Sequence, residues 1–80
     1  MDILEAYDIL HKYFSEDDLR TIYRIQNFDS SESDSIRKNE YNAKLLMDKE
    51  CHTVDKKEKE KLRLAARAFL NLANEENYHL

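Results

Sequence analysis

The chain has 80 residues, a formal net charge of −4, one cysteine, and neither glycine nor proline. A chain of this length forms one domain. Sandwiches, barrels and hairpin-rich folds need glycine or proline at tight turns, and phosphate-binding loops need glycine, so these classes are excluded. The composition therefore predicts an all-α fold, a small helical bundle of three to four helices.

Charge is distributed unevenly along the chain. Nine acidic and three basic residues precede position 36, whereas ten basic and eight acidic residues follow from there to the end. We expect a single helical domain over residues 1–80 in three parts: an acidic helical hairpin at 1–28, a polar linker at 29–35, and the third and fourth helices within 36–80.

The composition also bears on where the protein acts. One cysteine excludes an internal disulfide and fits a reducing compartment. No apolar run approaches the roughly 18 residues of a bilayer span, and the chain does not open with a signal peptide. We therefore expect a soluble, cytoplasmic protein without a membrane partner.

The first two helices are predicted on either side of Ser15. Apolar side chains recur at helical spacing over residues 2–14, and Asp2 suits the positive N-terminal end of a helix. A second helix follows over residues 16–27, because Ser15 and Asp18 have nearly the spacing of a capping box. Since almost no loop separates the two helices, we expect an antiparallel αα-hairpin.

The serine-rich stretch of residues 29–35 is predicted to be a spacer. Asp29 and Ser31 each have N-cap spacing to an acid three residues on, so they are expected to cap the third helix. An alternative is an acidic serine cluster open to phosphorylation, which would add negative charge at a helix start.

Residues 35–51 are predicted to form the third helix, which has apolar side chains on two faces. One face carries Ile36, Ala43, Leu46, Met47 and Cys51, and Tyr41 and Leu45 lie roughly opposite. A helix that is apolar on both sides is either central in its bundle or contacts a second subunit.

Residues 55–74 are predicted to form the fourth helix, with a stripe of Leu62, Ala65, Ala66, Phe69, Leu72 and Ala73. Apolar positions from 43 to 73 also fit an eleven-residue period with one fault, at Glu58. One fused helix over residues 35–75 is therefore an alternative to two shorter helices.

A row of bases is the first candidate functional surface. It consists of Lys56, Lys59, Arg63 and Arg67, spaced three, four and four residues apart along one flank of the fourth helix. Such a basic stripe is able to follow the phosphates of nucleic acid or to meet an acidic protein surface. The structural alternatives are a solvated face and pairing with acids of the same chain.

Two further surfaces are candidates for partner binding. An acidic face is expected at the N-terminus, where it would imitate nucleic acid or meet a basic partner; it comprises Asp2, Glu5, Asp8, Glu16, Asp17 and Asp18. Exposed apolar patches are expected opposite the main stripes of the third and fourth helices, at Tyr41 with Leu45 and at Leu64 with Ala68.

The sequence gives little support for catalysis. Asp48 and His52 are four residues apart beside Glu50 and Cys51, but a metal site needs three or four convergent ligands. Cys51 shares the apolar face of its helix, where a free cysteine usually behaves as a small buried hydrophobe. We therefore expect no metal, no cofactor and no enzymatic activity.

These observations favour a non-enzymatic protein-binding module, a regulator or inhibitor that acts through a helical surface. The partner would be another protein or a second copy of the chain, because a chain this short buries limited surface alone. The alternative is a nucleic-acid-binding regulator that uses the basic stripe. Small size, split charge and no catalytic constellation resemble the style of small bacterial or phage regulators and inhibitors.

Overall fold

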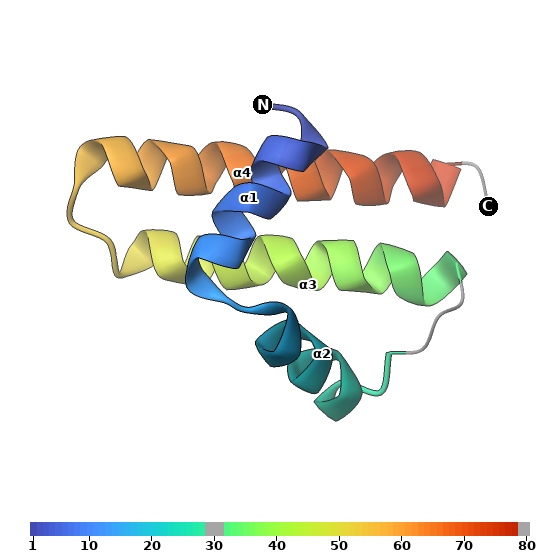
Figure 1. The fold of residues 1–80 in the computed structure, drawn as a ribbon. Helices are drawn as coiled ribbons and strands as arrows, with labels where there is room; N and C mark the ends of the chain where they lie inside the picture. The colour runs from blue at the N-terminus through green and yellow to red at the C-terminus, as the bar shows by residue number, and fades with distance from the viewer. Residues whose placement is uncertain (29–31, 79–80) are drawn as a thin grey trace.

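The computed structural model describes residues 1–28 and 32–78, with the backbone alone described at residues 32, 33 and 76–78. These residues form helices and no strand, which confirms the prediction of an all-α bundle. The helices are α1 (Ile3–Tyr13), α2 (Glu16–Ile25), α3 (Glu32–Cys51) and α4 (Lys56–Tyr78). Figure 1 shows α3 and α4 side by side, with α1 crossing them and α2 below.

Two separate helices, α3 and α4, occupy the region for which one fused helix was an alternative. They run antiparallel, and α3 ends at Cys51. The Thr53 hydroxyl donates to the Lys49 carbonyl at 2.6 Å, which satisfies one of the last carbonyls of α3. The Asp55 side chain then accepts from the backbone N–H of Glu58 at 2.9 Å, so it caps the start of α4.

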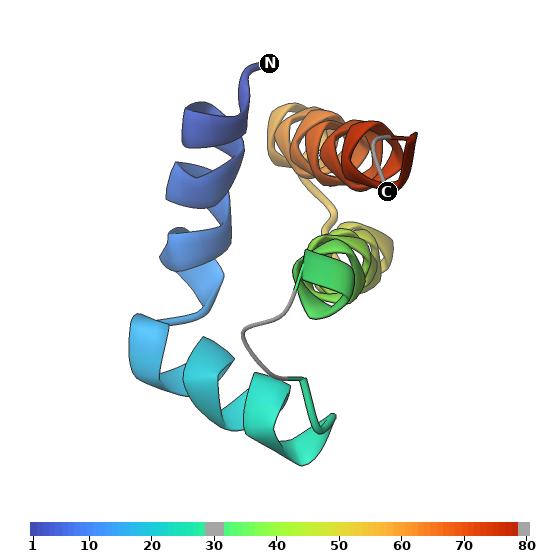
Figure 2. The same ribbon diagram turned by 90° about the vertical axis from the view of Figure 1, so that its right-hand side faces the viewer.

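The expected antiparallel pairing of α1 with α2 is not formed. Two extended residues, Phe14 and Ser15, connect the helices, and they redirect the chain so that α2 turns away from α1 (Figure 2). The main helix partner of α1 is α4. Both N-terminal helices therefore turn their apolar stripes toward α3 and α4 instead of toward each other.

The end of α2 and the beginning of α3 differ from the predicted positions: α2 ends two residues early, at Ile25, and α3 begins three residues early, at Glu32. The capping box of Ser15 and Asp18 is present, as predicted. The helix ends at Ile25 because Asn27 has a left-handed backbone with φ 60°, a conformation that asparagine tolerates. The caps predicted at Asp29 and Ser31 lie outside the described residues, so that prediction stays open.

The hydrophobic core lies between the two helix layers. It is made by Ala6, Leu10, Leu19, Ala43, Leu46, Leu62, Ala65, Ala66 and Phe69. Phe69 is the largest fully buried side chain, and the ring of Tyr7 meets it edge-on with 4.9 Å between ring centroids. The predicted stripes of the first and fourth helices therefore supply most of the core.

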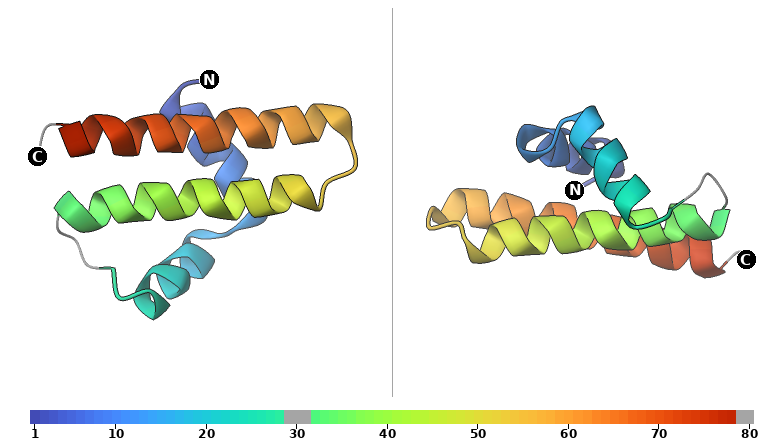
Figure 3. Two further views of the ribbon diagram at one scale, coloured as in Figure 1. Left: turned by 180° about the vertical axis from the view of Figure 1, so that it is seen from behind. Right: turned by 90° about the horizontal axis from the view of Figure 1, so that it is seen from below.

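The predicted stripe of the third helix is wrong at two positions. Met47 is 40% exposed and Cys51 is also exposed. The physical reason is the arrangement of layers: α1 and α2 lie on one side of the α3–α4 pair, and no described helix lies on the other side (Figure 3). Apolar positions on that second side remain in contact with solvent.

Candidate binding sites

A hollow lies between α1, α2 and α3, and we call it the three-helix hollow. Its volume is about 460 Å³. Its walls come from Tyr7 and His11 of α1, from Glu16, Leu19, Arg20 and Tyr23 of α2, and from Ser35, Lys38, Asn39 and Asn42 of α3.

Helical periodicity places these residues together. Within each helix every lining residue has another one three or four positions away, which is the spacing of one helix face. The α3 wall is unusual because its four residues are all polar, although Asn39 is only 4% exposed and Asn42 only 1%. At that depth an aliphatic side chain is the ordinary occupant, since buried amides must be hydrogen-bonded to be tolerated.

Aromatic side chains form part of the walls of the three-helix hollow. The Tyr23 hydroxyl donates to Oδ1 of Asn42 at 2.5 Å, and burial raises the pKa of Tyr23 while that hydrogen bond opposes the rise. The Lys38 ammonium lies 5.5 Å from the centre of the Tyr23 ring. On the opposite wall the rings of Tyr7 and His11 are stacked, with centroids 6.2 Å apart and 23° between their planes.

Sequence reasoning missed Asn39 and Asn42 as site residues. The signal that was available is their spacing, because Ser35, Asn39, Asn42 and Leu46 form one row at intervals of four, three and four. A row of polar residues that continues into an apolar residue indicates a helix face that packs against another helix through polar side chains as well as aliphatic ones.

The basic stripe is partly used within the fold. Lys59 donates to the backbone carbonyl of Glu50 at 3.2 Å, and Arg63 contacts the carboxylates of Glu50 at 3.4 Å and Glu60 at 3.3 Å. Lys56 and Arg67 form no ion pair with any residue that the structure describes. The stripe is therefore interleaved with acids, and two of its four members hold α4 to the end of α3.

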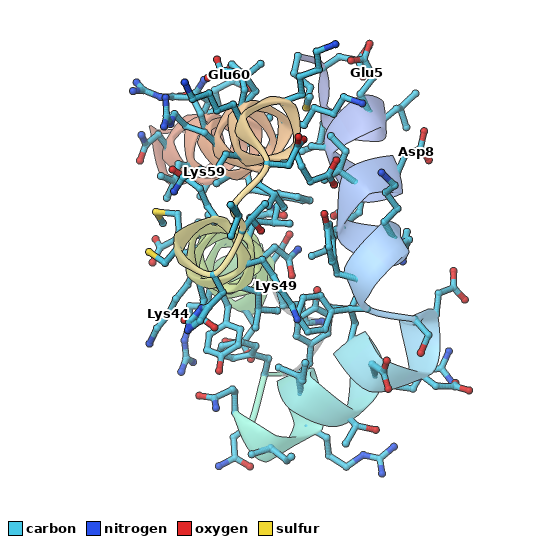
Figure 4. All side chains as sticks on the ribbon, turned by 90° about the vertical axis from the view of Figure 1, so that its left-hand side faces the viewer. Glu5, Asp8, Lys44, Lys49, Lys59 and Glu60 are labelled. Atoms are coloured by element: carbon cyan, nitrogen blue, oxygen red, sulfur yellow. The ribbon has the colours of Figure 1, made fainter. Side chains whose placement is uncertain are left out.

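The acidic face is divided between two helices. All six of its residues are exposed. Asp2 caps α1 by accepting from the Glu5 backbone N–H at 2.9 Å, and Asp18 completes the capping box of α2. Figure 4 shows Glu5 and Asp8 on the outer side of α1, directed away from α3 and α4. Two of the six acids therefore have a structural function in helix starts.

The two predicted apolar patches differ in exposure. Tyr41 is half-buried, with its ring edge against Phe28 at 5.9 Å between centroids, and Leu45 packs against the core. Leu64 is 42% exposed, whereas Ala68 is partly buried against the core. The expectation of exposure is therefore confirmed for Leu64 and wrong as stated for the other three.

A different apolar feature lies on the side of the α3–α4 pair that α1 and α2 leave open. Two hollows are found there, lined only by residues of α3 and α4, and Met47 lines both. The first, about 290 Å³, includes Arg63, Arg67 and Leu70, and the second, about 330 Å³, includes Lys44 and Cys51. We call this surface the open α3–α4 face.

The candidate metal ligands do not converge. Nδ1 of His52 lies 2.8 Å from the backbone oxygen of Asp48, so the ring is held at the helix end and not by the carboxylate. Among residues 1–28 and 34–75, whose side chains the structure describes, no group of three histidine, cysteine or acidic side chains is placed to hold a metal ion.

Comparisons with protein-family models, with curated proteins and with solved structures find no match for this chain. Among the described helices, none combines the length and the apolar character needed to cross a bilayer.

Proposed function

We propose that the chain is a non-enzymatic protein-binding module, a small cytoplasmic regulator or inhibitor, and that its docking surface is the open α3–α4 face. The observation that carries this proposal is Met47, which is 40% exposed where the two hollows meet. Flexible methionine side chains adapt to the shape of a partner, and they are common at binding surfaces.

The charges around Met47 favour an acidic partner. Lys44, Arg63 and Arg67 line the same two hollows and outnumber the two acids there, Asp48 and Glu50. Glu50 pairs with Arg63, whereas Arg67 has no ion-pair partner among the described residues. A helical segment with an apolar residue flanked by acids complements this arrangement. We propose such a segment of another protein as the occupant.

Self-association is less well supported. In a self-associated form, the acidic face of one copy would contact the basic residues of the next. The two contacting surfaces would therefore be different. Contacts between unlike surfaces do not close into a dimer unless the rotation between copies allows it, so they tend toward open chains.

The test compares Met47→Asp with Val54→Asp. Val54 is 94% exposed in the connection between α3 and α4, so it provides a matched apolar control outside the face. Each variant is checked for folding by circular dichroism, immobilised and exposed to extract of the source cells. We expect a partner retained by the wild type and by Val54→Asp but lost with Met47→Asp. Identical retention by all three proteins would exclude this face.

Nucleic-acid binding through the basic stripe is the second candidate, and Lys56 and Arg67 favour it because neither forms an ion pair within the described part of the chain. Glu50 and Glu60 beside Arg63 weigh against it, because acids within the stripe repel phosphates. A mobility-shift assay at low salt with mixed DNA and RNA tests it. Binding that weakens with salt and with Lys56→Gln plus Arg67→Gln supports it, and no shift excludes it.

A further inference from the structure

The three-helix hollow combines a polar wall with aromatic ones, and part of that polarity serves the fold, because Asn42 accepts a hydrogen bond from Tyr23. Its α3 wall is polar over its whole length, with Asn39 and Asn42 almost completely buried. Burial of amides contributes less to stability than burial of aliphatic groups of similar size, and an 80-residue chain has little core to lose. Polar groups that converge on a hollow are typical of ligand sites.

Positive charge predominates at the rim. The ammonium of Lys38 forms no ion pair with any described residue. Among the residues whose side chains are described, Arg20 pairs only with the exposed Asp17, at 3.6 Å, and exposed pairs of this kind contribute little. Glu16 is the one carboxylate among the lining residues, so the two cations outnumber it. The hollow therefore favours a negatively charged group, although the whole chain is acidic.

The walls also offer flat surfaces. Tyr7 and His11, whose rings are nearly parallel, line one wall, and Tyr23, whose ring has the Lys38 ammonium over it, lines another. Aromatic faces bind planar rings by stacking, and a nearby cation adds affinity for an anion attached to the ring. The volume of about 460 Å³ lies within the range typical of small-molecule sites.

From this juxtaposition we propose that the three-helix hollow binds a small organic anion that carries its charge on a planar ring. The ring lies between the Tyr7–His11 wall and Tyr23, and the anionic group lies at Lys38 and Arg20. Two sources supply this chemistry, namely aromatic carboxylates and nucleoside phosphates. The site lies between the two helix layers and is separate from the open α3–α4 face, so it stands independently of the proposed protein partner.

The test is a titration of ¹⁵N-labelled protein followed by NMR. Two sets of probes separate the contributions: 2-naphthoate with 2-naphthol and acetate, and adenosine monophosphate with adenosine and phosphate. In at least one set we expect the ring with its anion to bind about tenfold more tightly than either part alone, since charge-assisted hydrogen bonds are the stronger kind. The shifted amides should belong to the lining residues.

Two lysines of α3 provide a matched pair of variants. Lys38 and Lys44 each place an ammonium over a tyrosine ring, at 5.5 Å from Tyr23 and 5.7 Å from Tyr41, but only Lys38 lines the hollow. Lys38→Gln should weaken binding of the preferred anion about tenfold, and Lys44→Gln should change it less than about twofold.

The source of the ligand follows from which set binds. Preference for naphthoate indicates an aromatic carboxylate, and preference for the nucleotide indicates a nucleoside phosphate; both outcomes support the site. No shift at the lining residues with any probe at millimolar concentration would overturn the proposal. Equal losses of affinity in the two lysine variants would overturn it as well.

Discussion

Tyr13, at the end of α1, donates its hydroxyl to the carboxylate of Glu58 in the first turn of α4. The Lys12 ammonium lies 3.5 Å from the same carboxylate oxygen. The hydrogen bond to Glu58, followed by burial and the charge of Glu58, raises the pKa of Tyr13 to about 12. The same hydrogen bond lowers the pKa of Glu58. This contact ties the N-terminal layer to α4 across 45 positions of sequence.

The first prediction concerns the titration of Tyr13. In the wild type one tyrosine should ionise near pH 12 when the phenolate absorbance is followed. In Glu58→Gln that pKa should fall toward the ordinary value of about 10, because the carboxylate acceptor is gone. Tyr13→Phe should remove the step near pH 12, whereas Tyr23, whose pKa is also raised, still titrates. A wild-type titration without a step above pH 11 would contradict the prediction.

The same contact sets a pH window for stability. The raised pKa of Tyr13 means that its contribution is complete below about pH 10 and is lost as the pH rises through about 12. The lowered pKa of Glu58 means that its contribution is present at neutral pH and is lost as the pH falls below the ordinary range of a carboxyl. The urea midpoint of the wild type should therefore exceed that of Tyr13→Phe at pH 7, and the difference should shrink at pH 3. Tyr41→Phe is the control, because the Tyr41 hydroxyl has no hydrogen bond to a described residue.

The second prediction concerns the hydrogen bond that joins α2 to α3. Tyr23→Phe removes the donor to Asn42, whose side chain is almost completely buried. A buried acceptor without a partner costs about 1–3 kcal/mol. We therefore expect the free energy of unfolding to fall by about 1 kcal/mol or more in urea denaturation at pH 7. Tyr41→Phe should change it by less than about 0.5 kcal/mol. Equal changes in the two variants would show that the Asn42 contact contributes nothing.

Periodicity was sufficient to predict the faces of α1 and α4. Their stripes pack in one direction, so Leu10, Ala65 and Phe69 are all buried where the spacing placed them. The buried face of α3 was harder to predict, because α4 packs on one side of this helix and the α1–α2 layer packs on another. Apolar spacing alone therefore selected the exposed Met47 and overlooked the buried Asn42.

The path of the chain between α1 and α2 was also beyond a reading of the sequence. Both helices were predicted to within two residues of their ends, and the capping box at Ser15 was predicted correctly. Their relative direction depends on the extended backbone at Phe14 and Ser15, and a two-residue connection is compatible with several directions. Packing on α3 and α4 selects among them, through contacts such as that of Tyr13 with Glu58. These contacts join residues far apart in sequence, so no local sequence pattern predicts them.

The third prediction concerns Cys51, which the structure places at the exposed end of α3 and not in the core. Its thiol should react with a disulfide reagent in the native protein at a rate within about tenfold of that in urea, because exposure governs access to a free thiol. Cys51→Ala should change the free energy of unfolding by less than about 0.5 kcal/mol. A reaction that proceeds only at the rate of global unfolding would mean that the thiol is covered, either within the chain or by a second copy.

The fourth prediction concerns the break between α3 and α4. The Asp55 carboxylate accepts from the Glu58 backbone N–H at 2.9 Å, and its backbone carbonyl begins the hydrogen bonding of α4. Asp55→Ala should lower the free energy of unfolding by about 1 kcal/mol, the usual cost of losing an N-cap. Asp55→Asn should retain most of the stability, since asparagine caps about as well without the charge. If both variants lose the same amount, the charge of Asp55 matters rather than its cap. If neither loses stability, the turn of residues 52–55 is set by the packing of α3 on α4 alone.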